Sequence, residues 1–309
     1  MFKRKIIFLL MKILVIINPN SGKGNSELIF NKYIKNYLVN YNIDFELFIS
    51  KNKGEITNFV DKYDFNEDKN IFLLGGDGSL FEILQGIKDI NNFNIYLSPV
   101  GSGNGIYTSF NKPQFKFCKI KNDNNLLLSN FELNDKKGIF ALGISIGIIS
   151  DVDLNTEWMR FIGNTRYDLG GLYYILNTPS YNLKIKYTDV ENNNKLIEGK
   201  FLQVFIFKCS HCSDTMLLNS YQKMSDDNYT LIALPNTISK YELIKIFINL
   251  SAEYSPYYDN PKIIIDKIKS FEISPLDNNS INSLTIDGEY FHFNSPLKGS
   301  ICNKKIFIS

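Results

Sequence analysis

Residues 71–83, "IFLLGGDGSLFEI", determine the fold of the first third of the chain. Four apolar residues run into two glycines, an aspartate, a third glycine and a serine. This order predicts a buried strand, a tight loop and a helix. A tight turn needs only one or two glycines. The three glycines therefore indicate that another group approaches this backbone, and we expect the carboxylate of Asp77 to face it.

The same pattern recurs throughout residues 12–110. Strands are predicted at 13–17, 44–50, 71–74 and 95–100, and helices at 26–38, 54–63, 79–87 and from 105 onward. Apolar strands that alternate with helices indicate a parallel sheet covered on both faces. Ligands of such sheets bind at the carboxyl ends of the strands. The glycine-rich loops all fall there.

Beyond about residue 115 short strands predominate, which predicts a mainly antiparallel sheet. They are expected at 125–133, 137–149, 181–190, 199–207, 228–234, 270–275, 283–293 and 304–309, with helical segments at 164–177 and 239–253. We therefore predict an α+β protein. Residues 11–115 would form an α/β N-terminal domain with a parallel sheet, and residues 120–309 a mainly antiparallel β-sandwich.

The bulk composition excludes several classes of protein. The 309 residues are 44% hydrophobic and 21% charged, with a formal net charge of +2. This is the composition of a globular protein without the basic field that a nucleic-acid partner requires. The apolar N-terminus resembles a signal peptide, but Lys12 interrupts it and no cleavage site precedes Pro19. No run reaches the roughly 18 apolar residues that span a bilayer, so we expect a cytoplasmic protein that is soluble or peripherally bound to membranes.

The cysteines favour a reduced, intracellular setting, because four in a chain of this length are too few to cross-link it. They are Cys118, Cys209, Cys212 and Cys302. The sequence "CSHC" at 209–212 resembles half of a zinc site. No second pair of ligands accompanies it, so a structural zinc is not favoured.

Three loops carry the strongest chemical indication: "NPNSGKG" (18–24), "GGDGS" (75–79) and "PVGSGNG" (99–105). Successive glycines let backbone N–H groups converge on an anion, and the following helix adds its positive end. None of the loops matches a P-loop or a dinucleotide fingerprint. At the strand ends of one sheet they indicate a phosphate-rich ligand. Asp77 would then accept a proton from an attacking hydroxyl or hold a cation; alternatively it caps the helix from Ser79 or forms an Asx-turn.

Longer motifs resemble one family. "GGDGSLFEI" with "PVGSGNG" resembles the catalytic domain of the diacylglycerol kinase and sphingosine kinase superfamily, and "NPNSGKG" is similar to its first nucleotide loop. "DVDLNTEWMRFIGNTRY" (151–167) resembles the head-group segment of sphingosine kinases, which bacterial-type diacylglycerol kinases lack. "IDGEYF" (286–291) and "MSDDNYTLIAL" (224–234), with Asn228 in place of a glycine, are similar to later elements. The similarity extends from Lys12 to about Ser309.

The resemblance implies a role for each matching residue. Nucleotide contacts are implied for Asn18, Pro19, Asn20, Ser50, Gly54, Glu82, Gly101, Ser102, Gly103, Arg160, Arg166, Asp287, Gly288 and Glu289. Substrate contacts are implied for Gly75, Gly76, Asp77, Gly78 and Asp153. Asp77 would be the base, Asp153 would bind the lipid head group, and Asp287 would bind Mg²⁺.

These roles imply an ATP- and Mg²⁺-dependent kinase that phosphorylates the primary hydroxyl of a sphingoid base taken from a membrane surface. The alternatives are a diacylglycerol or ceramide kinase, a relative that binds lipid or nucleotide without catalysis, and a NAD kinase-like protein, since that group shares the "GGDG" loop. Bulky Ile106, Tyr107 and Thr108 stand where the family has small residues, and Phe81 where sphingosine kinases carry a histidine. The sequence leaves the acceptor's chain length and the oligomeric state open.

Several of these residues also have purely structural interpretations. Arg160 and Arg166 could pair with Glu157 or Asp168, and Asp151 with Asp153 could form a polar turn that ends a buried strand. Asp287 and Gly288 could be a hairpin turn.

The lipid tail also needs an apolar pocket, for which the sequence offers candidates. They are Phe201, Val204, Phe205, Phe207 and residues 216–218, with 241–254 as a gate. For each of these residues, membership of the core is the alternative.

Overall fold

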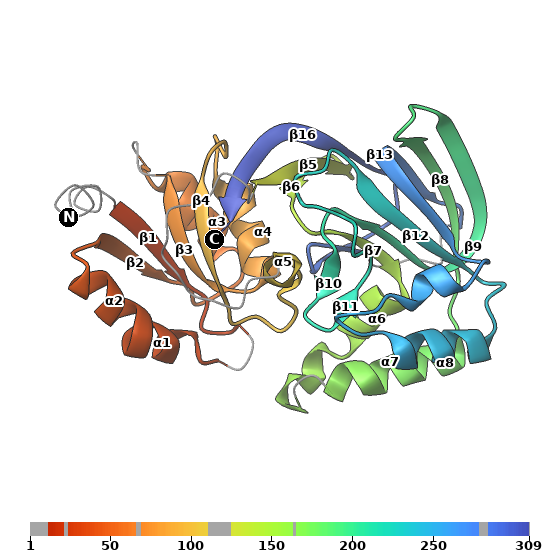
Figure 1. Ribbon diagram of the computed structural model, residues 1–309, viewed down its shortest axis with the longest axis horizontal. Helices are drawn as coiled ribbons and strands as arrows, with labels where there is room; N and C mark the ends of the chain where they lie inside the picture. The colour runs from red at the N-terminus through yellow and green to blue at the C-terminus, as the bar shows by residue number, and fades with distance from the viewer. Residues whose placement is uncertain are drawn as a thin grey trace. The chain divides into compact units, whose positions relative to one another are not determined.

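The computed structural model describes residues 12–21, 24–65, 69–110, 125–162, 165–277 and 284–308. The chain divides into two compact units, shown in Figure 1. The first comprises residues up to Leu126 together with Lys304–Ser309, and the second comprises Leu127–Asn303. The α+β class predicted from the sequence is confirmed, with a parallel sheet in the first unit and a mostly antiparallel one in the second.

The first unit is built on a parallel sheet whose strand order is β16-β4-β3-β1-β2. The strands are β1 (Lys12–Ile17), β2 (Asp44–Ile49), β3 (Asn70–Gly75), β4 (Asn94–Pro99) and the end of β16 (Leu297–Ile308). Every residue of β3 is buried, as is all of β1 after Lys12. Both strands are continuous apolar runs because each lies inside the sheet with both faces covered.

The helices of the first unit match the predicted segments. They are α1 (Ser26–Ile29), the π-helical η2 (Phe30–Ile34), α2 (Lys35–Asn40), α3 (Glu55–Lys62), α4 (Asp77–Gly86) and α5 (Gly105–Ser109). The helix predicted at 26–38 therefore forms with a π-helical turn in its middle. Helices α3 and α4 pack closely because Gly86 lacks a side chain: a Cβ there would lie 2.6 Å from the carbonyl oxygen of Thr57.

The second unit contains a larger sheet with the order β15-β14-β7-β9-β12-β13-β16, and β8 pairs with both β9 and β13. Its strands are β5 (Asn125–Leu133), β6 (Lys136–Phe140), β7 (Gly143–Gly147), β8 (Tyr181–Asp189), β9 (Asn194–Phe207), β12 (Tyr229–Pro235), β13 (Ile264–Pro275), β14 (Leu284–Ile286), β15 (Glu289–Phe291) and the start of β16, with the small ribbon β10 (His211–Ser213) and β11 (Met216–Leu217). Its helices are α6 (Ile148–Asn155), η3 (Glu157–Ile162), α7 (Thr165–Asn177), α8 (Lys240–Asn249) and η4 (Pro256–Asp259). No helix among the described residues is long and apolar enough to cross a bilayer.

The strand predicted at 137–149 was wrong, and the one at 283–293 is divided into β14 and β15. Residues 137–149 form β6, β7 and the start of α6 rather than a single strand. The strand ends at Gly147, whose φ of 123° suits only glycine and where a Cβ would lie 2.4 Å from the carbonyl oxygen of Leu202. A buried strand that runs into a half-buried helix gives an unbroken apolar run, so periodicity could not separate the two.

The division into units differs from the predicted domain limits at the C-terminus. Phe307 and Ile308 pair in parallel with Asn94 and Ile95 of β4, so residues 304–309 belong to the first unit. The sequence predicted the strand at 304–309 but placed it in the second domain. The predicted boundary at 115–120 lies outside the described residues.

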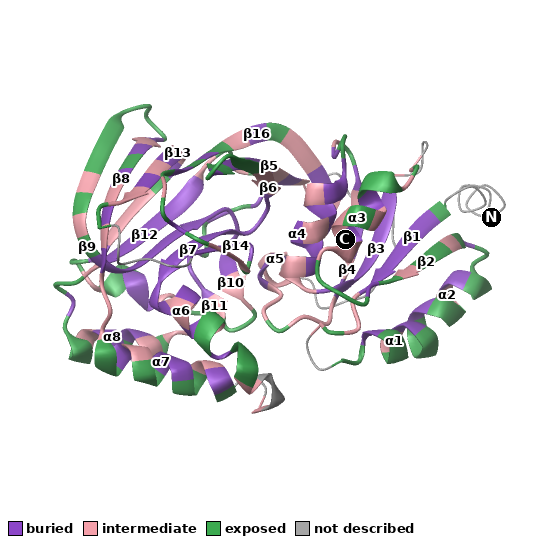
Figure 2. Cartoon of the chain, turned by 180° about the vertical axis from the view of Figure 1, so that it is seen from behind, coloured by how far each residue is buried: buried purple, intermediate pink, exposed green. Residues whose placement is uncertain are grey.

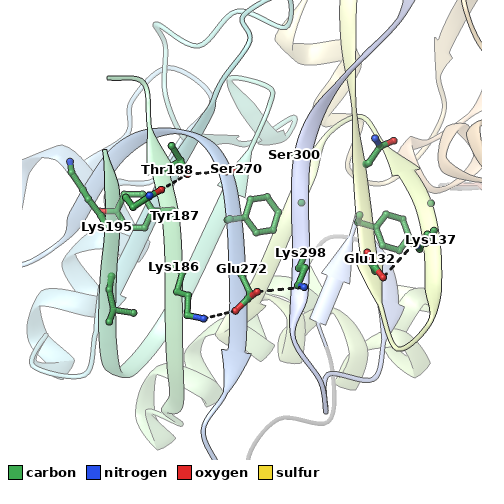
Figure 3. Close-up of a pocket in the computed structure, with 17 residues that line it drawn as sticks. Glu132, Lys137, Lys186, Tyr187, Thr188, Lys195, Ser270, Glu272, Lys298 and Ser300 are labelled. Atoms are coloured by element: carbon green, nitrogen blue, oxygen red, sulfur yellow. Dashed lines mark hydrogen bonds and ion pairs between the residues drawn. The ribbon is translucent and has the colours of Figure 1, made fainter. Parts of the chain in front are cut away.

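The outer face of the second sheet carries a hollow of about 940 Å³, shown in Figure 3. Its charged side chains are paired: Glu272 lies 2.9 Å from the Nζ of Lys186 and 3.7 Å from that of Lys298, and Lys137 pairs with Glu132. Such alternating charges are typical of the solvated face of an antiparallel sheet. None of the predicted site residues lines this hollow.

Candidate functional site

Two of the glycine loops of the first unit meet backbone to backbone. A Cβ on Gly101 would lie 2.5 Å from the Cα of Gly76, and a Cβ on Gly76 would lie 3.0 Å from the Cα of Gly101. No side chain fits at either position without separating the loops. The sequence predicted that another group approaches the "GGDG" backbone. At Gly76, that group is the backbone of the "GSGNG" loop.

The carboxylate of Asp77 holds the same two loops together. Its Oδ2 accepts a hydrogen bond from the backbone N–H of Gly105 (2.8 Å), and its Oδ1 accepts one from that of Ile106 (3.2 Å). A Cβ on Gly103 would lie 3.4 Å from Oδ2. Asp77 thus satisfies the first N–H groups of α5. The alternative in which Asp77 caps a helix from Ser79 does not hold, because α4 begins at Asp77 itself and its N-cap residue is Gly76.

Asn18 connects the first loop to this pair. Its backbone N–H donates to the carbonyl of Leu74 at the end of β3, and its side-chain Nδ2 donates to the Oγ of Ser79 (2.9 Å). Its Oδ1 accepts the backbone N–H of Asn20 (3.0 Å). One amide side chain therefore fixes the loop after β1 to the start of α4.

Glu82 connects α4 to the loop after β2. Its Oε1 accepts the N–H of Gly54 (3.0 Å), the residue before α3, whose φ is 83°. Its Oε2 is buried and has no hydrogen-bond partner in the described part of the chain. Buried carboxylate oxygens are almost always satisfied. The unmet acceptor is therefore a place where an N–H or O–H of a ligand would fit.

The structure thus brings together most of the predicted nucleotide and substrate residues of the first unit. Contacts link Asn18, Asn20, Gly54, Gly76, Asp77, Glu82, Gly101 and Gly103. Pro19, Gly75, Gly78 and Ser102 lie in the same loops, and Ser50 is buried directly after β2. The roles themselves remain predictions.

In the second unit, Asp153 lies on α6 among charged and phenolic groups. Burial raises the pKa of its carboxyl to about 6, a shift that the positive charge of Arg166 opposes and the negative charge of Glu157 increases. Burial, then the charge of Asp153, also raises the pKa of Tyr290 above its usual value. The alternative of a polar turn at Asp151 and Asp153 does not hold, since both residues lie in α6.

Arg166 is buried and already engaged. Its Nη1 donates to the Oε2 of Glu157 (3.1 Å) and to the carbonyl of Thr156 (3.3 Å), and its guanidinium lies 4.4 Å from the ring centroid of Tyr167. Arg166 therefore forms the ion pair with Glu157 that was the alternative to a phosphate contact. A phosphate contact of Arg166 remains a prediction, and the side chain of Arg160 lies outside the described residues.

Asp287 and Gly288 form the predicted two-residue hairpin turn between β14 and β15. Both have positive φ, 51° and 82°, as a type I′ turn requires. The carboxylate of Asp287 is buried and accepts the backbone N–H groups of Ala141, Leu142 and Gly143 at 2.7 to 2.9 Å. This saturated carboxylate does not fit an open Mg²⁺ ligand. No group of three acidic, histidine or cysteine side chains in the described residues forms a metal site, so we derive no step through a metal.

Sequence reasoning missed the neighbours of Asp153. Tyr290 follows Asp287–Glu289 directly, and Tyr167 follows Arg166, but neither was assigned a role. Their positions beside recognised motifs were the only available indication. The predicted tail-lining residues Phe201, Val204, Phe205 and Phe207 are buried in β9, and Phe205 packs against Tyr257. Their core role is confirmed, and a tail pocket remains a prediction.

The contact between Gly76 and Gly101 gives a direct test of the loop geometry. We expect Gly101→Ala to lower the free energy of unfolding by about 1–3 kcal/mol, because the added methyl overpacks the contact. Gly103→Ala is the matched control, since its Cβ would meet only Asp77 at 3.4 Å. Chemical denaturation measures both. Equal stability of the two variants would contradict the close approach.

Comparisons with known proteins agree with this geometry. Residues 12–128 match the family profile described as the diacylglycerol kinase catalytic domain. Sphingosine kinase 1 of Arabidopsis thaliana is 26% identical over 56% of this chain and 39% of the relative. Sphingoid long chain base kinase 5 of Saccharomyces cerevisiae is 28% identical over 61% and 30%. Human sphingosine kinase 1 is 19% identical over 90% and 85%.

The chain spans less than half of the length of the Arabidopsis and yeast relatives. Among solved structures, a diacylglycerol kinase from Bacillus anthracis has a TM-score of 0.63 at 17% identity, covering 96% of this chain and 97% of its own. A second structure from that organism reaches 0.70 at 18% identity with the same coverage. These structural likenesses show the fold. Residues 12–128 are therefore similar to the diacylglycerol kinase catalytic domain, and the three relatives named above are sphingosine and sphingoid long-chain base kinases.

Proposed function

We propose that this protein is an ATP-dependent lipid kinase that phosphorylates the primary hydroxyl of a sphingoid base. The carrying observation is the carboxylate of Asp77, fixed by two backbone amides where the glycine loops of the first unit meet. A loop cluster rich in backbone N–H groups suits a polyphosphate. A carboxylate among them suits proton transfer from an alcohol.

In the proposed reaction, Asp77 accepts the proton of the lipid hydroxyl as its oxygen attacks the γ-phosphorus of ATP. The bond from the γ-phosphorus to the bridging oxygen breaks, and ADP leaves with the electron pair. The amides of Gly105 and Ile106 fix the direction of the Asp77 carboxylate. Catalysis in phosphoryl transfer rests mainly on such positioning.

Asp153 supports an amine as the acceptor's head group. Its carboxyl is buried, and Arg166, whose charge acts on it, is already paired with Glu157. A protonated amine would provide the counter-charge that Asp153 needs, whereas the glycerol head of diacylglycerol offers none. The names of the curated relatives support the same choice.

The direct test is a panel of acceptors with labelled ATP. We expect label in sphingosine and not in diacylglycerol or ceramide. Asp77→Asn should lower kcat by about 10²–10⁴, the range of general-base catalysis. The control is Asp61→Asn, which changes an exposed carboxylate.

Label only in diacylglycerol would overturn the sphingoid assignment and leave the kinase intact. Full activity of Asp77→Asn would overturn the assigned base. A protein that binds ATP and lipid but transfers no label would be the non-catalytic alternative.

The raised pKa of Asp153 gives a pH dependence with a defined sign. Because only the ionised carboxylate attracts an amine, affinity for sphingosine should be full above pH 7 and fall as pH decreases through about 6. We expect kcat/KM for sphingosine to drop about tenfold per pH unit below that point. Asp153→Asn should lose most of this slope. An unchanged profile in the variant would exclude Asp153 as the titrating group.

The surface of α7 supports delivery of the lipid from a membrane. Its buried face uses glycines: Gly170 packs on Val152 of α6, and Gly171 packs on Phe247 of α8. Its outward face, coloured as exposed in Figure 2, carries large apolar side chains. Leu169, Leu172, Tyr173 and Leu176 are about half exposed, and nearby Trp158 on η3 is 73% exposed. We propose that this stripe of Trp158, Leu169, Leu172, Tyr173 and Leu176 inserts shallowly into a bilayer surface, as amphipathic elements do.

Vesicle binding tests this surface. We expect Leu172→Asp to lower the partition of the protein onto phosphatidylcholine vesicles by about 10- to 100-fold, the loss of one buried leucine. Leu28→Asp, on the equally exposed α1 of the first unit, is the control and should change little. Equal losses in both variants would refute a role specific to α7. Binding that neither variant weakens would refute it as well.

A further inference from the structure

Four polar side chains lie buried beneath α6 in the second unit. They are Ser145 of β7, Ser150 of α6, Gln203 of β9 and Thr285 of β14, each no more than 4% exposed. Burying polar groups costs free energy unless each forms hydrogen bonds. Apolar side chains would fill the same space more simply, so this cluster calls for a specific reason.

Gln203 supplies the N-terminal cap that α6 lacks in its own sequence. The residue before the helix is Gly147, which has no side chain to offer. The Oε1 of Gln203 accepts the backbone N–H of Ile149 in the first turn (2.9 Å). Its Nε2 donates to the Oγ of Ser145 (2.9 Å) and to the carbonyl of Val204 (3.1 Å). A residue from another strand thus satisfies a helix end, a task usually done by the N-cap residue.

Ser150 extends this network to the hairpin beside the helix. Its Oγ donates to the carbonyl oxygen of Ser145 (2.7 Å) and lies 3.3 Å from the Oγ1 of Thr285. Thr285 is the direct cross-strand partner of Tyr290. The network therefore contacts both elements that border the carboxyl of Asp153: the helix that carries it and the hairpin that carries Tyr290.

We propose that Gln203 is a positioning residue for the acceptor's head group, because it fixes the first turn of α6, the helix that carries Asp153. It acts through the N–H of Ile149 and the hydroxyl of Ser145 and does not touch the lipid. This inference rests on the proposed function, because the head group is taken to be an amine bound by Asp153.

The charged and phenolic groups that face Asp153 come from three elements besides α6. The charges of Glu157 on η3 and Arg166 on α7 act on Asp153, and the charge of Asp153 acts on Tyr290 of β15. Interactions between charges vary with distance and with access to water. Loosening the first turn of α6 would therefore change both the affinity for an amine and the protonation of Asp153.

The test compares two variants with the same chemical change. Gln203→Leu removes all three side-chain hydrogen bonds of Gln203 at nearly constant volume. The control, Gln222→Leu, alters a glutamine that is equally buried (4% exposed) and bonded to Asn228 and Thr230, away from α6. We measure the KM for sphingosine and for ATP, kcat, and the pKa of Asp153 by NMR in the protein without substrate.

We expect Gln203→Leu to raise the KM for sphingosine roughly 5- to 50-fold, since a small misplacement of a binding group is costly. The KM for ATP should not change. The pKa of Asp153 should fall toward the value of a hydrated carboxyl, and the amide of Ile149 should exchange faster. Gln222→Leu should show none of these effects, whatever its loss of thermal stability.

Unchanged sphingosine KM and Asp153 pKa in Gln203→Leu would overturn the inference, as would equal changes in both variants. If Gln203→Leu does not fold, Ser150→Ala replaces it, with an expected KM increase of roughly threefold from the loss of one buried hydrogen bond. If the wild-type protein phosphorylates no sphingoid base, the proposed function is wrong, but the role of Gln203 can still be tested. The NMR and exchange measurements still decide whether Gln203 positions Asp153.

Discussion

The hydrogen bonds from the backbone amides of Gly105 and Ile106 to the carboxylate of Asp77 are the contact on which the first unit's site depends. They join the end of β3 to the end of β4 across two loops that touch at Gly76 and Gly101. The glycines are required because any Cβ would separate the loops. The carboxylate is required because the first N–H groups of α5 need an acceptor. One interaction therefore shapes the loops and orients the proposed base.

In the second unit, the first N–H groups of a helix also need an acceptor from elsewhere in the chain. Helix α6 begins directly after a strand, at a glycine that cannot cap it, and the missing acceptor comes from Gln203 on β9. The carboxylate of Asp287 holds the turn between β6 and β7 in the same way, through three backbone N–H groups. In both units, polar side chains accept hydrogen bonds from backbone N–H groups at the ends of strands. Asp77 and Asp287 belong to the recognised motifs, whereas Gln203 does not.

These backbone contacts are structural roles that the motifs did not reveal. Asp287 was recognised from "DGE", yet its carboxylate is occupied by the β6–β7 turn, which lies about 145 residues away in sequence. The role of Arg166 was implied by the resemblance of residues 151–167, and an ion pair with Glu157 or Asp168 was the alternative. The burial of Arg166 was not predicted, because the local sequence does not show which face of α7 packs against the rest of the unit.

The sequence by itself determined the alternation of strands and helices in residues 12–110, the antiparallel character of the later strands, and the position of every glycine loop. Local propensity, apolar periodicity and turn chemistry act over a few residues, so they can be read directly. Only the tertiary structure decided that residues 137–149 break at Gly147, that residues 304–309 return to the first unit beside β4, and that Gln203 caps α6. Each of these depends on a partner far along the chain, and pairing over such distances leaves no periodic trace in the sequence.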